Sequence, residues 1–276
     1  YVETQSEPNI RASAQGLFMM MTNGFGAVAG SLLSGIIIEK YFMFHKPVQD
    51  LSIVIPAYDE ASRIQPTLLL LREYIDKKIE NTEVIIVDDG SKDNTFETVQ
   101  LLIRNWPEFN CIQLSKNQGK GAAIAEGVRH SNKTNLLFMD ADCSTDLNTI
   151  ELLFPYLSEK SAIVIGSRSI KGAKVSIHQN FLREFSAKFF NLWIQFCILP
   201  GLWDTQCGFK FFKTSLAKII FSDLFDSRFG FDMEVLYKAK KLGYLIQEKP
   251  VHWKNVAGTT VNPIRDGFKM ALHVLW

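Results

Sequence analysis

The sequence has no excess of charge of either sign. Among its 276 residues, 30 are Lys or Arg and 29 are Asp or Glu, so the formal net charge is +1. A protein that grips a nucleic acid backbone usually carries a marked basic surplus, and the composition therefore argues against nucleic acid as a partner. Cysteine is also scarce. Zinc sites and disulfide frameworks need a grouping of cysteines that is absent here, so we expect reduced thiols in a cytosolic setting, at Cys111, Cys143, Cys197 and Cys207.

The chain also lacks the phosphate-binding loops of two common nucleotide-binding classes. Residues 116–121 read KNQGKG, which is not the GxxxxGK[ST] spacing of a P-loop NTPase. A sugar-phosphate nucleotidyltransferase would carry a glycine-rich loop directly after its first strand, where this chain has residues 56–60, PAYDE. The KNQGKG segment could still offer backbone N–H groups and the Lys120 ammonium to a diphosphate or a base, or it could be a purely structural turn.

Charge is missing altogether from residues 12–38, a run of 27 residues. Because about 20 apolar residues cross a bilayer as a helix, we predict one transmembrane helix within residues 1–46. Gly26 and Gly30 have the GxxxG spacing of closely packed membrane helices. A signal peptide would be shorter and would follow a basic leader. Since the chain begins with Tyr1, we expect a fragment or a processed product.

Residues 11–26, RASAQGLFMMMTNGFG, resemble a late transmembrane helix of nucleoside/proton symporters of the major facilitator type. The resemblance covers about 40 residues, too few to transport anything. It leaves three interpretations open: a simple membrane anchor, the remnant of a gene fusion, or part of a larger transporter-like protein.

From Leu51 onwards, short β-branched runs alternate with segments of helical periodicity. We expect strands at 51–55, 84–87, 111–114, 136–139 and 162–165, and helices at 68–79, 96–104, 122–130 and 147–157. This alternation predicts an α/β fold with a mostly parallel sheet and helices on both faces. In such sheets, ligands bind beyond the carboxyl ends of the strands.

Charged clusters follow four of these strands, at residues 56–60 (PAYDE), 88–91 (DDGS), 140–142 (DAD) and 166–168 (GSR). One acidic pair after a strand is usually a turn or a helix cap, but several at one edge repel unless a cation lies between them. Asp140 and Asp142 point to the same side and offer only oxygen ligands, which suits Mg²⁺ or Mn²⁺. Asp88 and Asp89 suit a base and a ribose, or a turn closed by Gly90; both interpretations can hold.

These clusters, together with residues 117–123 (NQGKGAA), resemble the family 2 glycosyltransferases, which have the GT-A fold. The resemblance implies a nucleotide-sugar-binding half at 50–170 and an acceptor-binding, membrane-interface half at 171–276. It implies Asp140 and Asp142 as metal ligands. The residues expected to bind the donor are Pro56, Ala57, Tyr58, Glu60, Asp88, Asp89, Lys120, Asp140 and Ala141.

The second half contains an uncharged aromatic segment, residues 189–203, which is too short to span a bilayer. It suits either the membrane interface or a buried core helix. Basic residues flank it, as a phosphate head group would require. Residues 183–191, 204–210 and 229–234 resemble the dolichyl-phosphate hexosyltransferase branch. The expected acceptor-binding residues are Arg168, Arg183, Gln206 and Lys210.

Within that branch, the glucosyl members use UDP-glucose and the mannosyl members use GDP-mannose. Ser144 stands where the mannosyl members more often keep Gln, which favours glucose. We therefore expect inverting transfer of a hexose, glucose from UDP-glucose, to a polyprenyl phosphate (dolichyl or undecaprenyl) at the cytoplasmic membrane face. Asp142, Arg168 and Asp232 are the expected catalytic residues.

Alternatives remain open: a GDP-mannose donor, a sugar hydroxyl as acceptor, or a non-catalytic membrane-tethered nucleotide-binding protein. A phosphate acceptor is already anionic at pH 7, since its second pKa is about 6, and it needs no strong base. A sugar hydroxyl would need one, and Asp232 or Glu234 would be the candidates.

Overall fold

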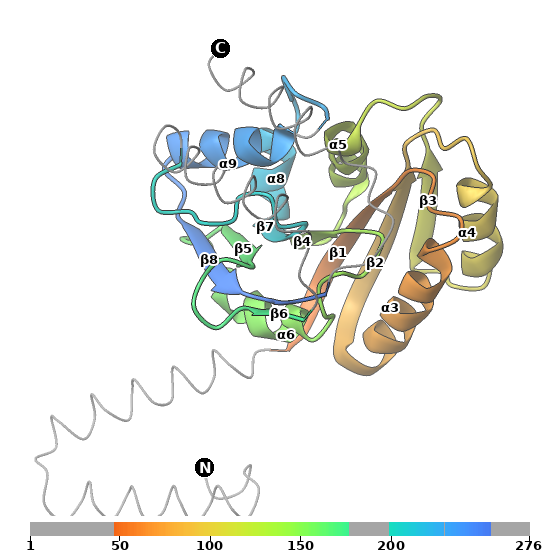
Figure 1. Ribbon diagram of the computed structural model, residues 1–276, viewed down its shortest axis with the longest axis horizontal. Helices are drawn as coiled ribbons and strands as arrows, with labels where there is room; N and C mark the ends of the chain where they lie inside the picture. The colour runs from red at the N-terminus through yellow and green to blue at the C-terminus, as the bar shows by residue number, and fades with distance from the viewer. Residues whose placement is uncertain (1–46, 177–198, 229, 255–276) are drawn as a thin grey trace, which may run out of the picture. The chain divides into compact units, whose positions relative to one another are not determined.

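The computed structural model describes residues 47–176, 199–228 and 230–254. The chain divides into two units, Tyr1–Lys46 and Pro47–Trp276, and everything described here belongs to the second. Its centre is a seven-stranded sheet of order β3-β2-β1-β4-β7-β5-β8 (Figure 1). The strands are β1 Val48–Ala57, β2 Ile79–Asp88, β3 Phe109–Gln113, β4 Asn135–Met139, β5 Ile163–Ser167, β7 Phe209–Lys213 and β8 Ile246–Pro250. A second sheet pairs β6 Lys174–Val175 with β9 His252–Trp253.

Most neighbouring strands of the large sheet are parallel. β1 pairs in parallel with β2 and β4, β2 with β3, and β5 with β8, while β7 runs antiparallel to both β4 and β5. Because β7 reverses the direction twice, β5 again runs the same way as β4. The carboxyl ends of β1, β2, β4 and β5 therefore share one edge, and the predicted mostly parallel α/β sheet is confirmed.

Helices cover both faces of the sheet. They are α3 Ile64–Lys78, α4 Thr95–Ile103, α5 Lys120–His130, α6 Thr149–Leu153 with the short helix η1 Phe154–Tyr156, α8 Thr214–Ile220 and α9 Phe231–Lys241. Successive residues of β1 belong to different apolar clusters: Ile53 packs with α3, α4 and α6, whereas Val54 packs with α5, α8 and α9. This division is the expected result of side chains alternating across a strand. The predicted helix 147–157 corresponds to α6 and η1.

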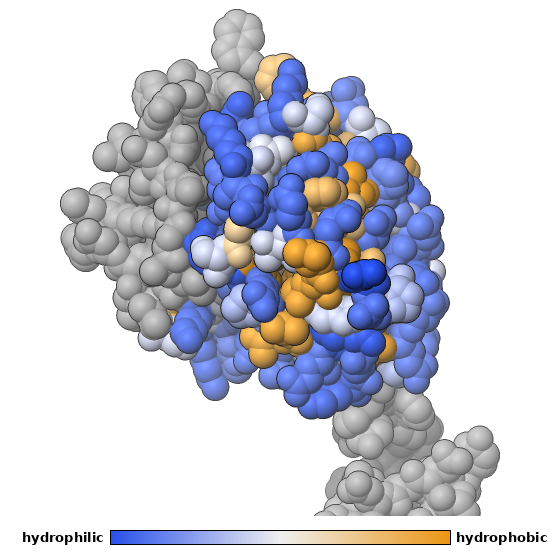
Figure 2. Space-filling model, turned by 90° about the vertical axis from the view of Figure 1, so that its right-hand side faces the viewer, coloured by the Kyte–Doolittle hydropathy of each residue, from blue (hydrophilic) through white to orange (hydrophobic). Residues whose placement is uncertain are grey.

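The face that carries α3, α4 and β3 is mostly hydrophilic, with a hydrophobic area near its centre (Figure 2). Exposed leucines on these helices include Leu69 at 46%, Leu70 at 54% and Leu101 at 75% of full exposure. Single exposed leucines are common on protein surfaces. Leu70 nevertheless differs from its neighbour Leu69, because it also borders a groove beside the sheet edge.

The predicted transmembrane helix lies in residues 1–46, outside the described residues. Arg183 and residues 189–198 of the aromatic segment also lie outside them. Within residues 47–176, 199–228 and 230–254, no helix combines the length and the apolar character needed to cross a bilayer.

Helix α5 packs unusually close to the sheet at Gly127. A Cβ atom built there would overlap Val54 Cγ1, and Val54 is fully buried. We expect Gly127→Ala to lower the free energy of unfolding by about 1–3 kcal/mol, the usual cost of overpacking, less any gain in helix propensity. Urea unfolding of Gly127→Ala, Val54→Ala and the double variant would measure it. The double variant should lose less free energy of unfolding than the two single variants lose together. A Gly127→Ala variant that is more stable than the wild type would contradict the close packing.

Candidate active site at the carboxyl edge of the sheet

The charged clusters predicted after β1, β2 and β4 lie at one edge of the sheet. Backbone hydrogen bonds at the ends of these strands hold the segments together. The Asp89 N–H donates to the Ala57 carbonyl at 2.8 Å, which joins the ends of β2 and β1. The Asp140 N–H donates to the Gly208 carbonyl at 3.1 Å, which joins the end of β4 to the segment before β7. The loops that follow β1, β2 and β4 are thus held side by side.

Asp88 is fully buried, and both of its carboxylate oxygens have partners. Oδ1 accepts the Ser91 N–H at 3.3 Å and also the Ser91 hydroxyl, while Oδ2 accepts Gln113 Nε2 at 3.1 Å. The turn predicted at residues 88–91 is therefore present. The predicted contact of Asp88 with a nucleoside stays a prediction.

Asp89 organises the KNQGKG segment. Its carboxylate accepts the N–H groups of Gln118 at 2.7 Å and Gly119 at 2.8 Å, and the Asn117 side-chain amide at 3.0 Å. Burial raises the pKa of Asp89, and the two backbone N–H groups oppose that rise by stabilising the anion. Asp89 therefore positions the start of α5, where Lys120 is the first residue. Whether it also contacts the donor stays a prediction.

The loop after β1 carries the remaining donor candidates. Pro56 and Ala57 are buried in the strand, while Tyr58 and Glu60 are half-buried. Glu60 Oε1 accepts Arg63 Nη2 at 2.7 Å. Burial raises the pKa of Glu60, and the Arg63 guanidinium acts in the opposite direction. Tyr58 thus stands at the sheet edge, and its expected contact with the donor stays a prediction.

Lys120 and Asp140 form an ion pair of 2.5 Å between Nζ and Oδ1. Burial disfavours the charged ammonium, but Asp140 and Asp232 outweigh it and raise the pKa of Lys120 above its usual value. A Cβ atom on Gly208 would overlap the Asp140 carboxylate, so any other residue there would displace that carboxylate. We had not singled out Gly208 from the sequence, although it lies in the segment DTQCGFK.

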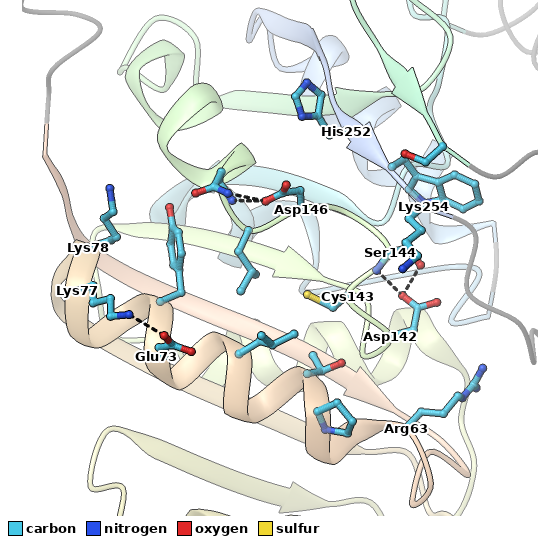
Figure 3. Close-up of a pocket in the computed structure, with 18 of the residues that line it drawn as sticks. Arg63, Glu73, Lys77, Lys78, Asp142, Cys143, Ser144, Asp146, His252 and Lys254 are labelled. Carbon is cyan, nitrogen blue, oxygen red and sulfur yellow. Dashed lines mark hydrogen bonds and ion pairs between the residues drawn. The ribbon is translucent and has the colours of Figure 1, made fainter.

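Asp142 lies two residues further along and is half-buried. Its Oδ1 accepts the Ser144 N–H at 3.0 Å and the Ser144 hydroxyl (Figure 3). In the described part of the chain, no group of three or more His, Cys, Asp or Glu side chains could hold a metal ion. Two neighbouring carboxylates still fit Mg²⁺ or Mn²⁺, because such ions commonly take one or two carboxylates and complete their shell with water and substrate phosphates. Ala141, between the two aspartates, is buried.

Arg168 is held by Asp204. Its Nε and Nη2 donate to the two Asp204 oxygens at 2.7 and 2.8 Å, and its guanidinium lies 5.4 Å from the Trp253 ring centroid. Burial of Asp204 opposes its ionisation, but the guanidinium prevails and the pKa of Asp204 falls below its usual value. The Arg168 side chain keeps 30% exposure. Its predicted catalytic and acceptor-binding roles stay predictions, as does that of the half-buried Gln206.

Lys210 is fully buried in β7. Its ammonium donates to the Cys207 carbonyl at 2.7 Å and to Asp232 Oδ1 at 2.5 Å, and it lies 5.0 Å from the Phe138 ring centroid. Burial raises the pKa of Asp232, while Lys210 and Lys120 favour its anion. The pair joins α9 to the sheet. The structure thus places Lys210 away from the surface, and its predicted contact with an acceptor stays a prediction, as does the catalytic role of Asp232.

The Lys210–Asp232 pair yields a stability prediction. Lys210→Met leaves a buried carboxylate without its partner, and we expect it to lower the free energy of unfolding by about 3–5 kcal/mol. The double variant Lys210→Met/Asp232→Leu removes both charges, so it should lose much less than the single variant. Urea unfolding measures both. If the double variant loses as much stability as Lys210→Met or more, the ion pair is not the interaction that holds α9.

Comparison with protein families identifies two segments. Residues 52–221 match the model of glycosyl transferase family 2, and residues 1–57 match that of the nucleoside H⁺ symporter. The second match confirms the resemblance noted for the N-terminal segment, and it extends into β1.

Solved structures with the same fold include a mannosyltransferase from Pyrobaculum calidifontis in complex with GDP-Man and Mn²⁺, with a TM-score of 0.55, 18% identity and coverage of 89% of this chain and 69% of that chain. Glucosyl-3-phosphoglycerate synthase from Mycobacterium tuberculosis, in complex with Mn²⁺, UDP and its product, has a TM-score of 0.55, 17% identity and coverage of 84% and 79%. At such identities the likeness shows the fold alone.

The dolichyl-phosphate beta-glucosyltransferases are more similar to this chain in sequence than these solved structures are. The dolichyl-phosphate beta-glucosyltransferase of Dictyostelium discoideum is 34% identical over 237 residues, 82% of this chain and 72% of the relative. The human enzyme is 31% identical over 247 residues, 85% and 76%. The Saccharomyces cerevisiae enzyme is 32% identical over 242 residues, 80% and 72%. The chain therefore belongs to glycosyl transferase family 2, among the relatives of the dolichyl-phosphate beta-glucosyltransferases, and is a glycosyltransferase.

Proposed function

We propose that this protein transfers glucose from UDP-glucose to dolichyl phosphate and inverts the configuration at the anomeric carbon. The observation that carries the proposal is its 34% identity to the Dictyostelium dolichyl-phosphate beta-glucosyltransferase over 82% of the chain. The arrangement at the carboxyl edge agrees with it, because the residues expected to meet a nucleotide sugar come from the ends of β1, β2 and β4.

In this proposal, the nucleoside lies by Tyr58 and the loop after β2, and the diphosphate lies by Asp140 and Asp142. These two carboxylates would hold Mg²⁺ or Mn²⁺, which supplies positive charge to the leaving diphosphate. Lys120 adds a further positive charge at the start of α5, and its raised pKa keeps it protonated at neutral pH. Ser144 holds the Asp142 carboxylate in place through two hydrogen bonds.

The surroundings of the possible bases favour an acceptor that needs none. Asp232 is buried and paired with Lys210. Glu234 accepts the N–H groups of Phe225 and Asp226 and pairs with Lys238 at 2.7 Å. A sugar hydroxyl must lose a proton as it attacks, whereas a phosphate monoester is already anionic, since its second pKa is about 6. Attack opposite the leaving diphosphate would give a β-linked lipid phosphate from an α-linked donor.

A dolichyl phosphate acceptor also places the reaction at a membrane surface, with the catalytic unit on the cytoplasmic side. An undecaprenyl phosphate offers the same phosphate and a similar chain. GDP-mannose is the competing donor, and Ser144 is the residue that favours glucose over it.

Donor and acceptor are tested together by incubating the protein with radiolabelled UDP-glucose or GDP-mannose, a polyprenyl phosphate and Mg²⁺ or Mn²⁺. We expect label in the organic phase from UDP-glucose with dolichyl phosphate, and at least about tenfold less from GDP-mannose, which is a modest requirement beside the discrimination that polar contacts to a substrate can give. Label that enters the organic phase only from GDP-mannose would replace glucose by mannose. Label that stays in water-soluble glycosides would overturn the lipid acceptor.

The metal assignment predicts a large effect of Asp142→Asn, which keeps the size of the side chain and removes its charge. We expect kcat to fall by at least about 100-fold, equivalent to about 2.7 kcal/mol. Asp76→Asn is the matched control, because it makes the same substitution at an exposed position of α3, where the carboxylate accepts Arg72 Nε at 3.0 Å. It should keep most of the activity. Full activity of Asp142→Asn, or of the wild type in EDTA, would exclude a metal at this position.

A further inference from the structure

A groove runs from Asp142 along the side of α3 and has a volume of about 850 Å³. One wall is a single face of α3, formed at helical spacing by Arg63, Pro66, Leu70, Tyr74 and Lys78. Figure 3 shows Arg63, Asp142 and Lys254 at one end of the groove and Glu73, Lys77 and Lys78 at the other. The groove therefore begins at the predicted metal-binding carboxylate and leads away from it.

The opposite wall is one hydrogen-bonded unit formed by residues 142–148 and β9. Thr145 and Trp253 form a β-bridge, the Lys254 N–H donates to the Ser144 carbonyl at 2.8 Å, and the Asp146 N–H donates to the His252 carbonyl at 3.1 Å. Since the loop and β9 are tied together, both walls consist of ordered backbone.

Most of the cations that line the groove already have a carboxylate partner: Arg63 pairs with Glu60 at 2.7 Å. Lys77 pairs with Glu73 at 2.6 Å, and Lys78 pairs with Glu151 at 3.3 Å. Lys254 forms no ion pair with any residue in the described ranges 47–176, 199–228 and 230–254. An anionic group entering beside Asp142 would therefore meet a cation that no residue in the described part of the chain neutralises.

Between the two ends, the groove is largely apolar. Pro66, Leu70 and Tyr74 line it from α3, and Leu147 and Trp253 from the opposite wall. Pro66 and Tyr74 are eight residues apart on the helix, about 12 Å at 1.5 Å per residue. A nucleotide sugar is polar along its whole length, and Tyr58, Asp88 and Asp89, expected to bind it, do not line this groove. The groove suits an amphiphile with one anionic end.

We propose that this groove binds the acceptor lipid, with the phosphate of the polyprenyl phosphate beside Lys254 and the first isoprene units against Leu70 on α3. This inference rests on the proposed function, since it takes a polyprenyl phosphate as the acceptor. It assigns the acceptor to the groove between α3 and residues 142–148, which does not include Tyr58, Asp88 or Asp89 in its lining. Inversion requires the phosphate oxygen to attack the anomeric carbon from the side away from the leaving diphosphate, and the Asp142 end of the groove is where the two substrates would meet.

Neighbouring leucines provide a matched test. Leu70→Arg puts a charge into the groove, whereas Leu69→Arg puts the same charge on an equally exposed position of α3 that does not line it. We expect Leu70→Arg to raise the KM for dolichyl phosphate in detergent micelles at least about tenfold, the loss of more than about 1.4 kcal/mol of binding, with the KM for UDP-glucose unchanged. Leu69→Arg should change neither KM. Equal effects of the two variants on dolichyl phosphate would overturn the proposal. Thermal unfolding of both verifies that they fold.

A second measurement does not depend on turnover. A polyprenyl phosphate with a photoreactive group on its first isoprene unit is crosslinked to the full chain, and the labelled peptides are mapped. Label in residues 64–78 or 142–148, reduced by Leu70→Arg and retained in Leu69→Arg, supports the groove. Label confined to other segments overturns it. If the groove is labelled but no glucose is transferred to dolichyl phosphate, the proposed function fails while the lipid site stands.

Discussion

Buried negative charge at one edge of the sheet is the constraint on which the rest of the structure depends. Asp88, Asp204 and Asp232 are almost completely buried, and Asp89 is exposed by only 3%. An unpaired carboxylate in a protein interior costs several kcal/mol, so each of these groups must be met by hydrogen-bond donors or by a cation. The loops around the edge are arranged to supply them.

The carboxylates at this edge of the sheet are stabilised in two different ways, one on each side. Asp88 and Asp89, on the side of β1 and β2, are met by neutral donors: backbone N–H groups, amides and a hydroxyl. Asp140, Asp204 and Asp232, on the side of β4, β5 and β7, are met by Lys120, Arg168 and Lys210. The first side suits a neutral, hydrogen-bonding nucleoside. The second concentrates cations close to where a diphosphate and a phosphate acceptor would come together, which fits the repulsion that such a reaction has to overcome.

The same ion pairs also assemble the fold. Lys120 links α5 to the loop after β4, Arg168 links the end of β5 to the segment before β7, and Lys210 links β7 to α9. Removing one of these charges would disturb both the packing of the fold and the geometry of the site. Kinetic experiments on these residues therefore need a measurement of stability as well. The α3 side of Asp142 is different, because the ion pairs of Lys77 and Lys78 there are exposed and of small energetic weight. Changes in the groove should therefore affect binding without loss of fold.

The sequence alone determined the α/β class, the strands and helices from β1 to β5, and the edge of the sheet at which the polar clusters meet. These features follow from hydrophobic periodicity and from the rule that parallel strands end on the same side, both of which are local properties of the chain. The family likewise followed from short motifs at residues 55–60, 87–91 and 140–142.

Only the tertiary structure decided what each charged residue contacts. Lys210, expected to bind the acceptor, is buried against Asp232, and Arg168 is held by Asp204. Both contacts arise because β7 inserts between β4 and β5 and brings together residues 22 and 36 positions apart. No local pattern encodes that insertion. Gly208 is another example, since its need for glycine arises from the Asp140 carboxylate, which is distant in the sequence and close only after folding.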